Sequence, residues 1–340
     1  WHSTAGFRLN DDNHHDLILR HEGSDIAVKV HYRADGYVID MPDTLPLPEH
    51  LHCFFLMEKI DPDIVKTWLH LNNISGGALG HLLNKPVVMG IHNYHSADGG
   101  DQLEVEMARR VAKHVVCCSS PIRDACLETG YDPAKLQVIN NGTDPDYFQH
   151  SASGRRKVRT SCNIKNNAPV IGIAAEFQPF KRHDYFLKAA RQLLKTHPNA
   201  HFLLCGKWLE GNEKLSRLIS MLKLEEHVHV LGVRNDMPDV YSAMDIHTLC
   251  SENEPFGLAI IEAMACETIN VTMNAIPELS EGIGIPLPSS TDPAVLANAW
   301  AEILDLPEAE KRKRQKAGRD RIVNEYSITS TVEAYDTMFE

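Results

Sequence analysis

The chain has 340 residues, 43% of them hydrophobic, and a formal net charge of -12. This length can bury a large core and predicts two domains. The acidic balance argues against nucleic-acid binding, and no apolar run reaches the ~20 residues of a membrane helix. The eight cysteines include no CxxC pair, which favours free thiols in a reducing, cytoplasmic protein. No transmembrane segment is expected, while peripheral membrane contact and the oligomeric state stay open.

The stretch before residue 85 has the weakest pattern. Residues 25–33 (DIAVKVHYR) alternate as in a strand and are followed by a Pro-rich loop. Residues 54–58 predict a short strand, and residues 63–71 predict either a strand or a short helix. Within the segment 70–84, a helix is expected to begin at Gly76 and Gly77.

From residue 85 onward, strands and helices alternate regularly. The predicted strands are 86–94, 114–119 and 135–142, and the predicted helices are 99–113 and 120–130. This alternation implies a parallel sheet covered by helices, with ligands beyond the carboxyl ends of its strands. His92, Asn141 and Gly142 follow predicted strands and should lie at that edge.

A polar, basic stretch divides the chain. We take residues 1–150 as a first Rossmann-like domain, 151–168 as a linker, 169–322 as a second Rossmann-like domain and 323–340 as a C-terminal helix. In the second half, strands are predicted at 169–177, 201–207, 228–232, 245–250, 269–273 and 284–288. Helices are predicted at 181–197, 212–224, 237–244, 258–266 and 275–282, with three more over 291–340. The expected fold class is α/β, with two doubly wound units facing a cleft.

The stretch 251–264 (SENEPFGLAIIEAM) holds two carboxylates, Glu254 and Glu262, between a predicted strand and a predicted helix. Gly257 stands at the helix entrance, where unpaired N–H groups and the positive end of the helix dipole suit a phosphate. Glu254 should lie in the loop beside the ligand. Glu262, in the second turn, suits sugar hydroxyls, as an acidic residue holds the ribose in dinucleotide folds. Taken alone, both are equally well read as solvent-facing helix charges.

Several spaced segments carry a family resemblance. They are GIAAEFQPFKRHDYFLKAA, HFLLCGKW, VLGVRNDMPDVYSAMDIHTLCSENEPFGLAIIEAMAC and IPELSEG in the second half, and VVCCSSPIRDAC and VINNGTDPDYF in the first. Over residues 85–340 the chain resembles the glycosyltransferases of family 4, which are retaining nucleotide-sugar enzymes of the two-domain GT-B type. The combination is specific because the motifs occur in the family's order. The resemblance implies C-terminal helices that cross back to the first domain.

The resemblance also implies roles for individual residues. Lys181 matches the lysine that binds the donor diphosphate, and Glu254 the carboxylate that contacts hydroxyls of the transferred sugar. Glu262 would hold the ribose. His92 matches a histidine that approaches the donor sugar, although a capped or core histidine is the alternative. The remaining donor-binding positions are Glu176, the nucleobase loop Gly232, Val233 and Arg234, and the loop Pro255, Phe256, Gly257 and Leu258, whose last three residues offer backbone N–H groups.

Enzymes of this family need no metal and no resident cofactor, since the nucleotide-sugar is a co-substrate. Fixed positive charge and N–H dipoles stabilise the departing diphosphate. Retention is drawn as front-face attack, in which the leaving phosphate helps to deprotonate the acceptor hydroxyl. The D-P-D strings at Asp61/Asp63 and Asp144/Asp146 are predicted to be turns rather than metal sites.

The sequence departs from the family pattern in four places. Glu176 stands where Arg is usual, five positions before Lys181, and Glu267 stands where Gly usually ends the helix. If position 267 is left-handed, a non-Gly residue costs roughly 1–2 kcal/mol there. The Gly-Gly before IPEL is absent, and no Gly-rich N-terminal loop is recognisable.

Three functions therefore remain open. The first is a retaining, metal-independent transferase that moves a sugar from a nucleotide-diphosphate-sugar to a sugar, lipid-linked or small-molecule acceptor. The second is a weakened or silent GT-B protein that binds nucleotide or sugar, or serves as a partner subunit. The third is a GT-B phosphorylase or epimerase, which the fold alone does not separate from the others. The donor base, the sugar and the acceptor are not determined by the sequence.

Overall fold

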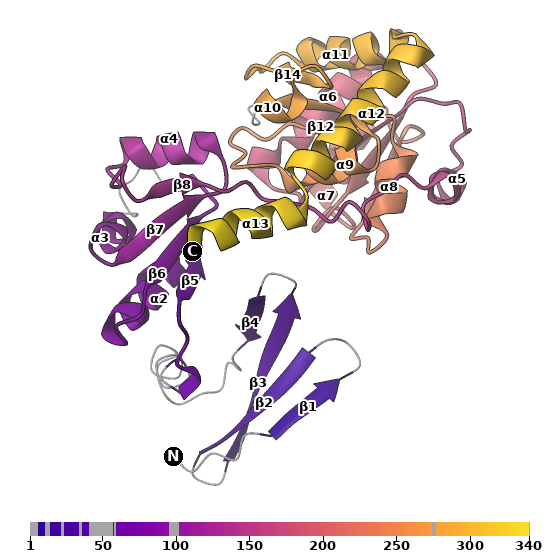
Figure 1. The fold of residues 1–340 in the computed structure, drawn as a ribbon. Coiled ribbons are helices and arrows are strands. Elements are labelled where there is room, and N and C mark those ends of the chain that lie inside the picture. The colour runs from indigo at the N-terminus through magenta and orange to yellow at the C-terminus, as the bar shows by residue number, and fades with distance from the viewer. Residues whose placement is uncertain are drawn as a thin grey trace.

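The computed structural model describes residues 6–10, 14–21, 24–33, 36–40, 57, 59–94, 102–273 and 277–339. Within these residues the strands form three sheets, two of them parallel and covered by helices (Figure 1). The predicted strand at 54–58 lies almost wholly outside the described residues. No helix in the described ranges is long and apolar enough to span a bilayer.

The first sheet is an antiparallel meander that stands apart from the two parallel sheets in Figure 1. Its strands are β1 (Gly6–Asn10), β2 (His14–His21), β3 (Ser24–Arg33) and β4 (Gly36–Asp40). The strand expected at 25–33 is confirmed as β3. This meander is not part of the parallel sheet of the first domain. Only two residues separate β2 from β3, too few for the crossover that a parallel pair requires.

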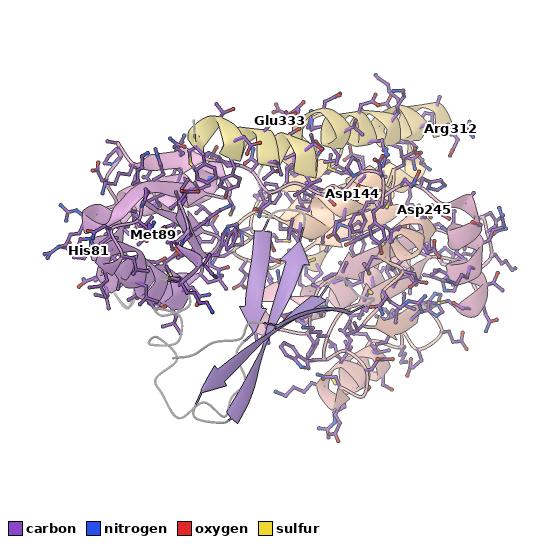
Figure 2. All side chains as sticks on the ribbon, turned by 60° about the horizontal axis from the view of Figure 1, so that its bottom comes forward. His81, Met89, Asp144, Asp245, Arg312 and Glu333 are labelled. Atoms are coloured by element: carbon purple, nitrogen blue, oxygen red, sulfur yellow. The ribbon has the colours of Figure 1, made fainter. Side chains whose placement is uncertain are left out.

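The first parallel sheet begins at residue 65 and has the order β5-β6-β7-β8. Its strands are β5 (Val65–Trp68), β6 (Val87–Ile91), β7 (Ala112–Cys117) and β8 (Leu136–Val138). Its helices are α2 (His70–Leu82), α3 (Gln102–Arg110) and α4 (Ser120–Glu128). β6 is buried throughout, as expected for a strand covered on both faces. Met89, labelled in Figure 2, lies in its core.

Helix α2 starts six residues earlier than predicted, so Gly76 and Gly77 lie in its middle rather than at its entrance. A Cβ at Gly76 would lie 2.5 Å from the Thr67 side chain, and one at Gly77 would lie 2.6 Å from Met89. The two glycines therefore let α2 pack directly on the sheet. Glycine usually marks the end of a helix, but here the close packing of α2 on the sheet requires glycine in the middle of the helix.

The second parallel sheet has the order β11-β10-β9-β12-β13-β14. Its strands are β9 (Val170–Ala174), β10 (His201–Cys205), β11 (Val228–Gly232), β12 (Ile246–Leu249), β13 (Ile269–Met273) and β14 (Ile285–Leu287). The chain runs outward from β9 through β10 to β11, then returns to the other side of β9 with β12. The order reverses between β9 and β12, and such a switch point opens a crevice at the carboxyl ends of the strands.

The helices of the second domain cover both faces of this sheet. They are η1 (Pro179–Lys181), α6 (His183–Leu193), α7 (Glu213–Met221), α8 (Met237–Ala243), α9 (Leu258–Ala265), α10 (Pro277–Ser280) and α11 (Pro293–Asp305). On one face, Trp300 packs edge-on to Phe186 and donates its indole N–H to Thr248 at 2.8 Å. Trp300 is fully buried, so this hydrogen bond satisfies a polar group that burial would otherwise penalise.

The predicted linker at 151–168 is wrong for most of its length, because it contains helix α5 (Ala152–Ser161). α5 packs on α8, and its Arg159 is completely buried. The Arg159 guanidinium donates to Asp245 at 2.9 Å and to several backbone carbonyls, among them Ala243 at 2.9 Å. Arg155 donates to the other oxygen of Asp245 at 2.7 Å. Asp245, labelled in Figure 2, thus fastens a basic helix to the second domain.

The C-terminal helices cross back to the first domain, as predicted. α12 (Glu308–Glu325) lies on the second domain beside α9, and α13 (Ile328–Phe339) continues to the first (Figure 1). At the crossing, Thr143 and Ser327 form an isolated parallel bridge. Tyr335 on α13 packs against first-domain residues that include Val88. The domains are therefore joined by a second connection besides the chain around residue 150.

Replacing Asp245 by Ala should lower the free energy of unfolding by about 3 kcal/mol, because a buried guanidinium is left without its counter-charge. Urea-induced unfolding measures the loss. Glu213→Ala is the matched control, since this carboxylate is 84% exposed and pairs with Arg217 along α7; its effect should stay below about 0.5 kcal/mol. Equal effects of the two substitutions would contradict the proposed anchoring.

Glu267, which follows α9, has φ 59° and is exposed. Glu267→Gly should raise the free energy of unfolding by about 1 kcal/mol, because it removes the steric cost of a side chain in the left-handed region. Glu267→Ala, which keeps the Cβ, should give no such gain. If thermal unfolding shows the same stability for Gly and Ala at this position, backbone strain is not the reason.

Candidate functional site

The candidate site is a pocket of about 670 Å³ at the switch point of the second sheet, closed on one side by the first domain. The ends of β9 and β12 line its floor through Ala174 and Leu249. We call it the switch-point pocket. It gathers eight of the twelve residues expected to bind the donor or take part in catalysis, namely His92, Glu176, Lys181, Glu254, Pro255, Phe256, Gly257 and Leu258, together with Asn141.

Lys181 and Glu254 meet in this pocket although 73 positions separate them. Lys181 ends η1, after β9, and Glu254 lies in the loop after β12. The Lys181 Nζ donates to Glu254 Oε2 at 3.0 Å, and the side chains are 19% and 11% exposed. Glu252 N also donates to Phe180 O at 3.1 Å, which ties the two loops together. The ammonium group thus rests against a carboxylate at the mouth of the pocket.

The N-terminus of α9 opens into the same pocket. Gly257 has φ 96° and precedes the helix, and no side chain caps it. A Cβ at Gly257 would lie 2.6 Å from Ile260, so the turn needs glycine on both conformational and steric grounds. An uncapped helix start presents N–H groups and a partial positive charge to its surroundings. Here those surroundings include the Lys181 ammonium.

The first domain holds this loop in place. Ser119 caps α4 and donates its hydroxyl to Pro255 O at 2.5 Å. The Phe256 side chain is 2% exposed and packs against Tyr326, where the chain crosses back to the first domain. The Pro255–Phe256–Gly257 turn is therefore clamped between the domains, and its backbone faces the pocket.

His92 follows β6 at the carboxyl edge of the first sheet, as predicted. Its Nε2 is buried and has no hydrogen-bond partner among the described residues. Burial, together with the charge of Lys66, lowers the pKa of His92 to about 4. The imidazole is therefore neutral near pH 7 and offers an uncharged donor or acceptor at the wall of the pocket.

Glu176 lies in the loop after β9 and lines the pocket with Lys181. Its side chain forms no ion pair with any described residue. The charged groups lining the pocket are therefore two carboxylates and one ammonium. An Arg at position 176 would reverse this balance, so Glu176 is the feature that least suits an anionic ligand.

Four predicted residues lie outside the pocket lining. Glu262 is in the second turn of α9, as predicted, and one of its oxygens accepts from Tyr241 at 2.7 Å. Burial raises the pKa of Glu262, while the Tyr241 hydroxyl opposes the rise. Gly232 ends β11 and Val233 and Arg234 follow it, and the Arg234 guanidinium donates to Asp236 at 2.8 and 2.7 Å. None of these four residues lines the pocket.

Sequence reasoning overlooked several polar and aromatic lining residues, namely Asn93, Tyr94, Phe180 and Asn253. They stand in loops, where no periodic pattern marks them. Their positions next to His92, Lys181 and Glu254 were the only signal. Burial raises the pKa of Tyr94, with smaller contributions from Cys118 and Glu254, so its phenol stays protonated and can donate.

The described residues contain no group of three His, Cys, Asp or Glu side chains that could hold a metal ion. The two D-P-D strings do not line the pocket. Asp144 accepts from the backbone N–H of Asp146 at 2.9 Å, as in a turn, and Asp61 pairs with Lys85 at 2.5 Å.

The sequence matches two described families. Residues 13–147 match the Glycosyltransferase Family 4 description, and residues 154–320 match Glycosyl transferases group 1. A UDP-Gal:alpha-D-GlcNAc-diphosphoundecaprenol alpha-1,3-galactosyltransferase of Escherichia coli is 25% identical over 84% of this chain and 76% of its own length. A D-inositol 3-phosphate glycosyltransferase of Kineococcus radiotolerans is 29% identical over 65% of this chain. The chain spans only 54% of that second relative.

Solved structures share the fold. Alr3699/HepE of Anabaena, in complex with UDP-glucose, has a TM-score of 0.78 at 22% identity, over 85% of this chain and 81% of that one. A sucrose-phosphate synthase from Thermosynechococcus elongatus has a TM-score of 0.74 at 21% identity, over 91% and 84% of the two chains. With the ordered motifs, the two facing domains and the two family matches, the chain belongs to the GT-B glycosyltransferases of family 4.

Proposed function

We propose that this protein transfers a sugar, with retention and without a metal ion, from a nucleotide-diphosphate-sugar to a hydroxyl acceptor. The observation that carries the proposal is the meeting of Lys181, Glu254 and the uncapped start of α9 in one pocket. An ammonium group and a helix N-terminus suit a diphosphate. The adjacent carboxylate suits sugar hydroxyls.

In the proposed reaction, the bond between the anomeric carbon and the diphosphate oxygen breaks as a bond to the acceptor oxygen forms on the same face. The acceptor's proton passes to the leaving phosphate, so no protein nucleophile is needed. Positive charge at Lys181 and the α9 amides stabilises the diphosphate as its negative charge grows. His92, neutral because burial lowers its pKa, can hydrogen-bond the donor sugar without repelling the developing cation.

Binding of the donor also requires an exchange of partners. In the structure Lys181 is paired with Glu254. A diphosphate that engages Lys181 frees the Glu254 carboxylate, which can then accept hydrogen bonds from the sugar. The two roles are therefore coupled, because an intact donor supplies a replacement partner to both side chains.

UDP-sugars are the donors we favour. The support comes from relatives, since the E. coli enzyme is named for UDP-Gal and the Anabaena protein was solved with UDP-glucose. Two relatives named above act on acceptors that carry phosphate, a diphosphoundecaprenol-linked GlcNAc and D-inositol 3-phosphate. We extend both features to this chain as proposals. The free thiols of the described cysteines support a cytoplasmic location.

Glu176 favours a second candidate, a protein of this fold that binds nucleotide with little or no turnover. A carboxylate facing a diphosphate is repulsive by several kcal/mol at an effective dielectric of ~20. The two candidates differ in one measurable property, because only the first releases nucleotide from a nucleotide-sugar by hydrolysis or transfer.

Turnover is tested by supplying UDP-, GDP- and ADP-sugars and measuring nucleotide release. We expect release with at least one donor, and Lys181→Ala should lower its rate about 10²–10³-fold, as removal of a preorganised charge-stabilising group does. Lys188→Ala is the control, since Lys188 is exposed and pairs with Asp184. The transferase proposal fails if no donor is turned over, and nucleotide binding without release would favour the second candidate.

Charge balance in the pocket is tested with UDP alone. Glu176→Arg should tighten UDP binding by at least about tenfold, because it replaces repulsion by a charge-assisted contact. Glu254→Gln should also tighten UDP binding by severalfold, since it releases Lys181, yet it should slow transfer. Titration calorimetry gives both affinities. Weaker UDP binding by Glu254→Gln would rule out competition between Glu254 and the diphosphate.

A further inference from the structure

A second pocket adjoins the switch-point pocket on the side of the first domain. Its volume is about 650 Å³, and its walls are the end of β5, the loops after β6 and β8, and one face of α13. We call it the α13 pocket. His92, Asn141 and Leu258 line both pockets, so a molecule in one borders a molecule in the other. The buried Nε2 of His92, which has no partner among the described residues, lies at this shared wall.

The α13 pocket combines aromatic rings with a cation. Lys66 Nζ lies 3.2 Å from the centre of the Tyr335 ring and 4.5 Å from that of Trp68. Phe339 also lines the pocket and stacks on Tyr335 with ring centres 6.1 Å apart. Flat apolar surfaces with one fixed charge are typical of small-molecule sites, in which the apolar part gives area and the charge gives orientation.

The placement of Trp68 depends on Gly90. A Cβ at Gly90 would lie 2.5 Å from the Trp68 ring, so β6 leaves room for the indole at the sheet edge. The rings therefore come from two distant parts of the chain, the edge strand β5 and the last helix. Only the crossing of α13 back to the first domain completes the α13 pocket.

We propose that the α13 pocket is the acceptor subsite and that it takes a phosphate ester of a hydroxylated molecule, with Lys66 binding the phosphate. This inference rests on the proposed transferase function and adds to it the pocket that receives the acceptor and the residue that binds its phosphate. An ammonium group on a flexible stem suits phosphate, whereas Arg is preferred where a carboxylate is held by two parallel bonds. The charge of Lys66 reaches His92, whose pKa it helps to lower, so the cation lies near the junction with the switch-point pocket.

Asp336 is the acidic side chain among the lining residues, and it stands on the exposed side of α13. It should weaken the binding of any anion. Replacing Asp336 by a neutral residue should therefore change anion affinity in the direction opposite to a replacement of Lys66. Asp336 makes no hydrogen bond or ion pair to the described part of the first domain.

The test uses glucose 1-phosphate and glucose as a matched pair of probes, titrated by calorimetry into the full chain carrying Lys181→Met. That background removes the cation of the switch-point pocket. We expect glucose 1-phosphate to bind more tightly than glucose. Adding Lys66→Met should weaken glucose 1-phosphate about tenfold, the size of one hydrogen bond to a charged group, and leave glucose unchanged. Lys113→Met, at an exposed position on β7, is the control and should change neither.

Because Lys66 also contacts Tyr335, its replacement can loosen α13. Asp336→Asn keeps that contact and should tighten glucose 1-phosphate about threefold, as expected for loss of one exposed like charge. Equal affinity for the two probes, or a phosphate affinity that neither substitution changes, would overturn the proposal. The assay needs neither donor nor turnover, so its result is independent of whether UDP-sugars are hydrolysed.

A second experiment, with lipid vesicles, distinguishes a lipid-linked phosphate ester from a soluble one. Phosphatidylcholine vesicles with and without a polyprenyl phosphate are sedimented with the protein. Lys66-dependent binding to the phosphate-bearing vesicles assigns the pocket to a lipid-linked phosphate. Lys66-dependent binding of glucose 1-phosphate without vesicle binding assigns it to a soluble one.

Discussion

The arrangement of this molecule depends on the reversal of strand order between β9 and β12 in the second sheet. The two strands are neighbours in space although more than 70 residues separate them in sequence. The loops that leave their carboxyl ends must therefore run side by side, and one carries Lys181 while the other carries Glu254 and the entrance to α9. Topology alone brings a cation, a carboxylate and a helix N-terminus to one point. The first domain adds His92 and the Ser119 clamp on Pro255.

Charge is the second constraint. A pocket suited to diphosphate needs net positive potential, yet this one is lined by two carboxylates and one ammonium. In the free site the charges of Lys181 and Glu254 neutralise each other. The α9 dipole therefore supplies much of the remaining attraction for an anion. Glu176 is therefore the lining residue whose charge most opposes an anionic ligand. The neighbouring α13 pocket has Lys66 among its rings, so a second cation stands close to where the acceptor would enter.

Much of the fold could be predicted because its signals are local. The alternation after residue 85 and the strand–loop–helix around Glu254 both follow from neighbouring residues. Features that depend on distant contacts could not be predicted. Helix α5 reads as a basic linker because the counter-charge of Arg159 is Asp245, 86 positions away. Gly76 and Gly77 look like a helix entrance in the sequence, because the side chains that need their lack of a Cβ, Thr67 and Met89, belong to the strands β5 and β6. Tyr94 and Asn253 reach the pocket from loops that carry no pattern.

The most direct measurement is a crystal structure of the protein with bound UDP. We expect the β-phosphate at hydrogen-bond distance, about 3 Å, from both the Lys181 Nζ and the backbone N–H groups at the start of α9. We also expect that Lys181 has left Glu254. A diphosphate bound elsewhere, or one bound while the Lys181–Glu254 pair remains closed, would contradict the central claim.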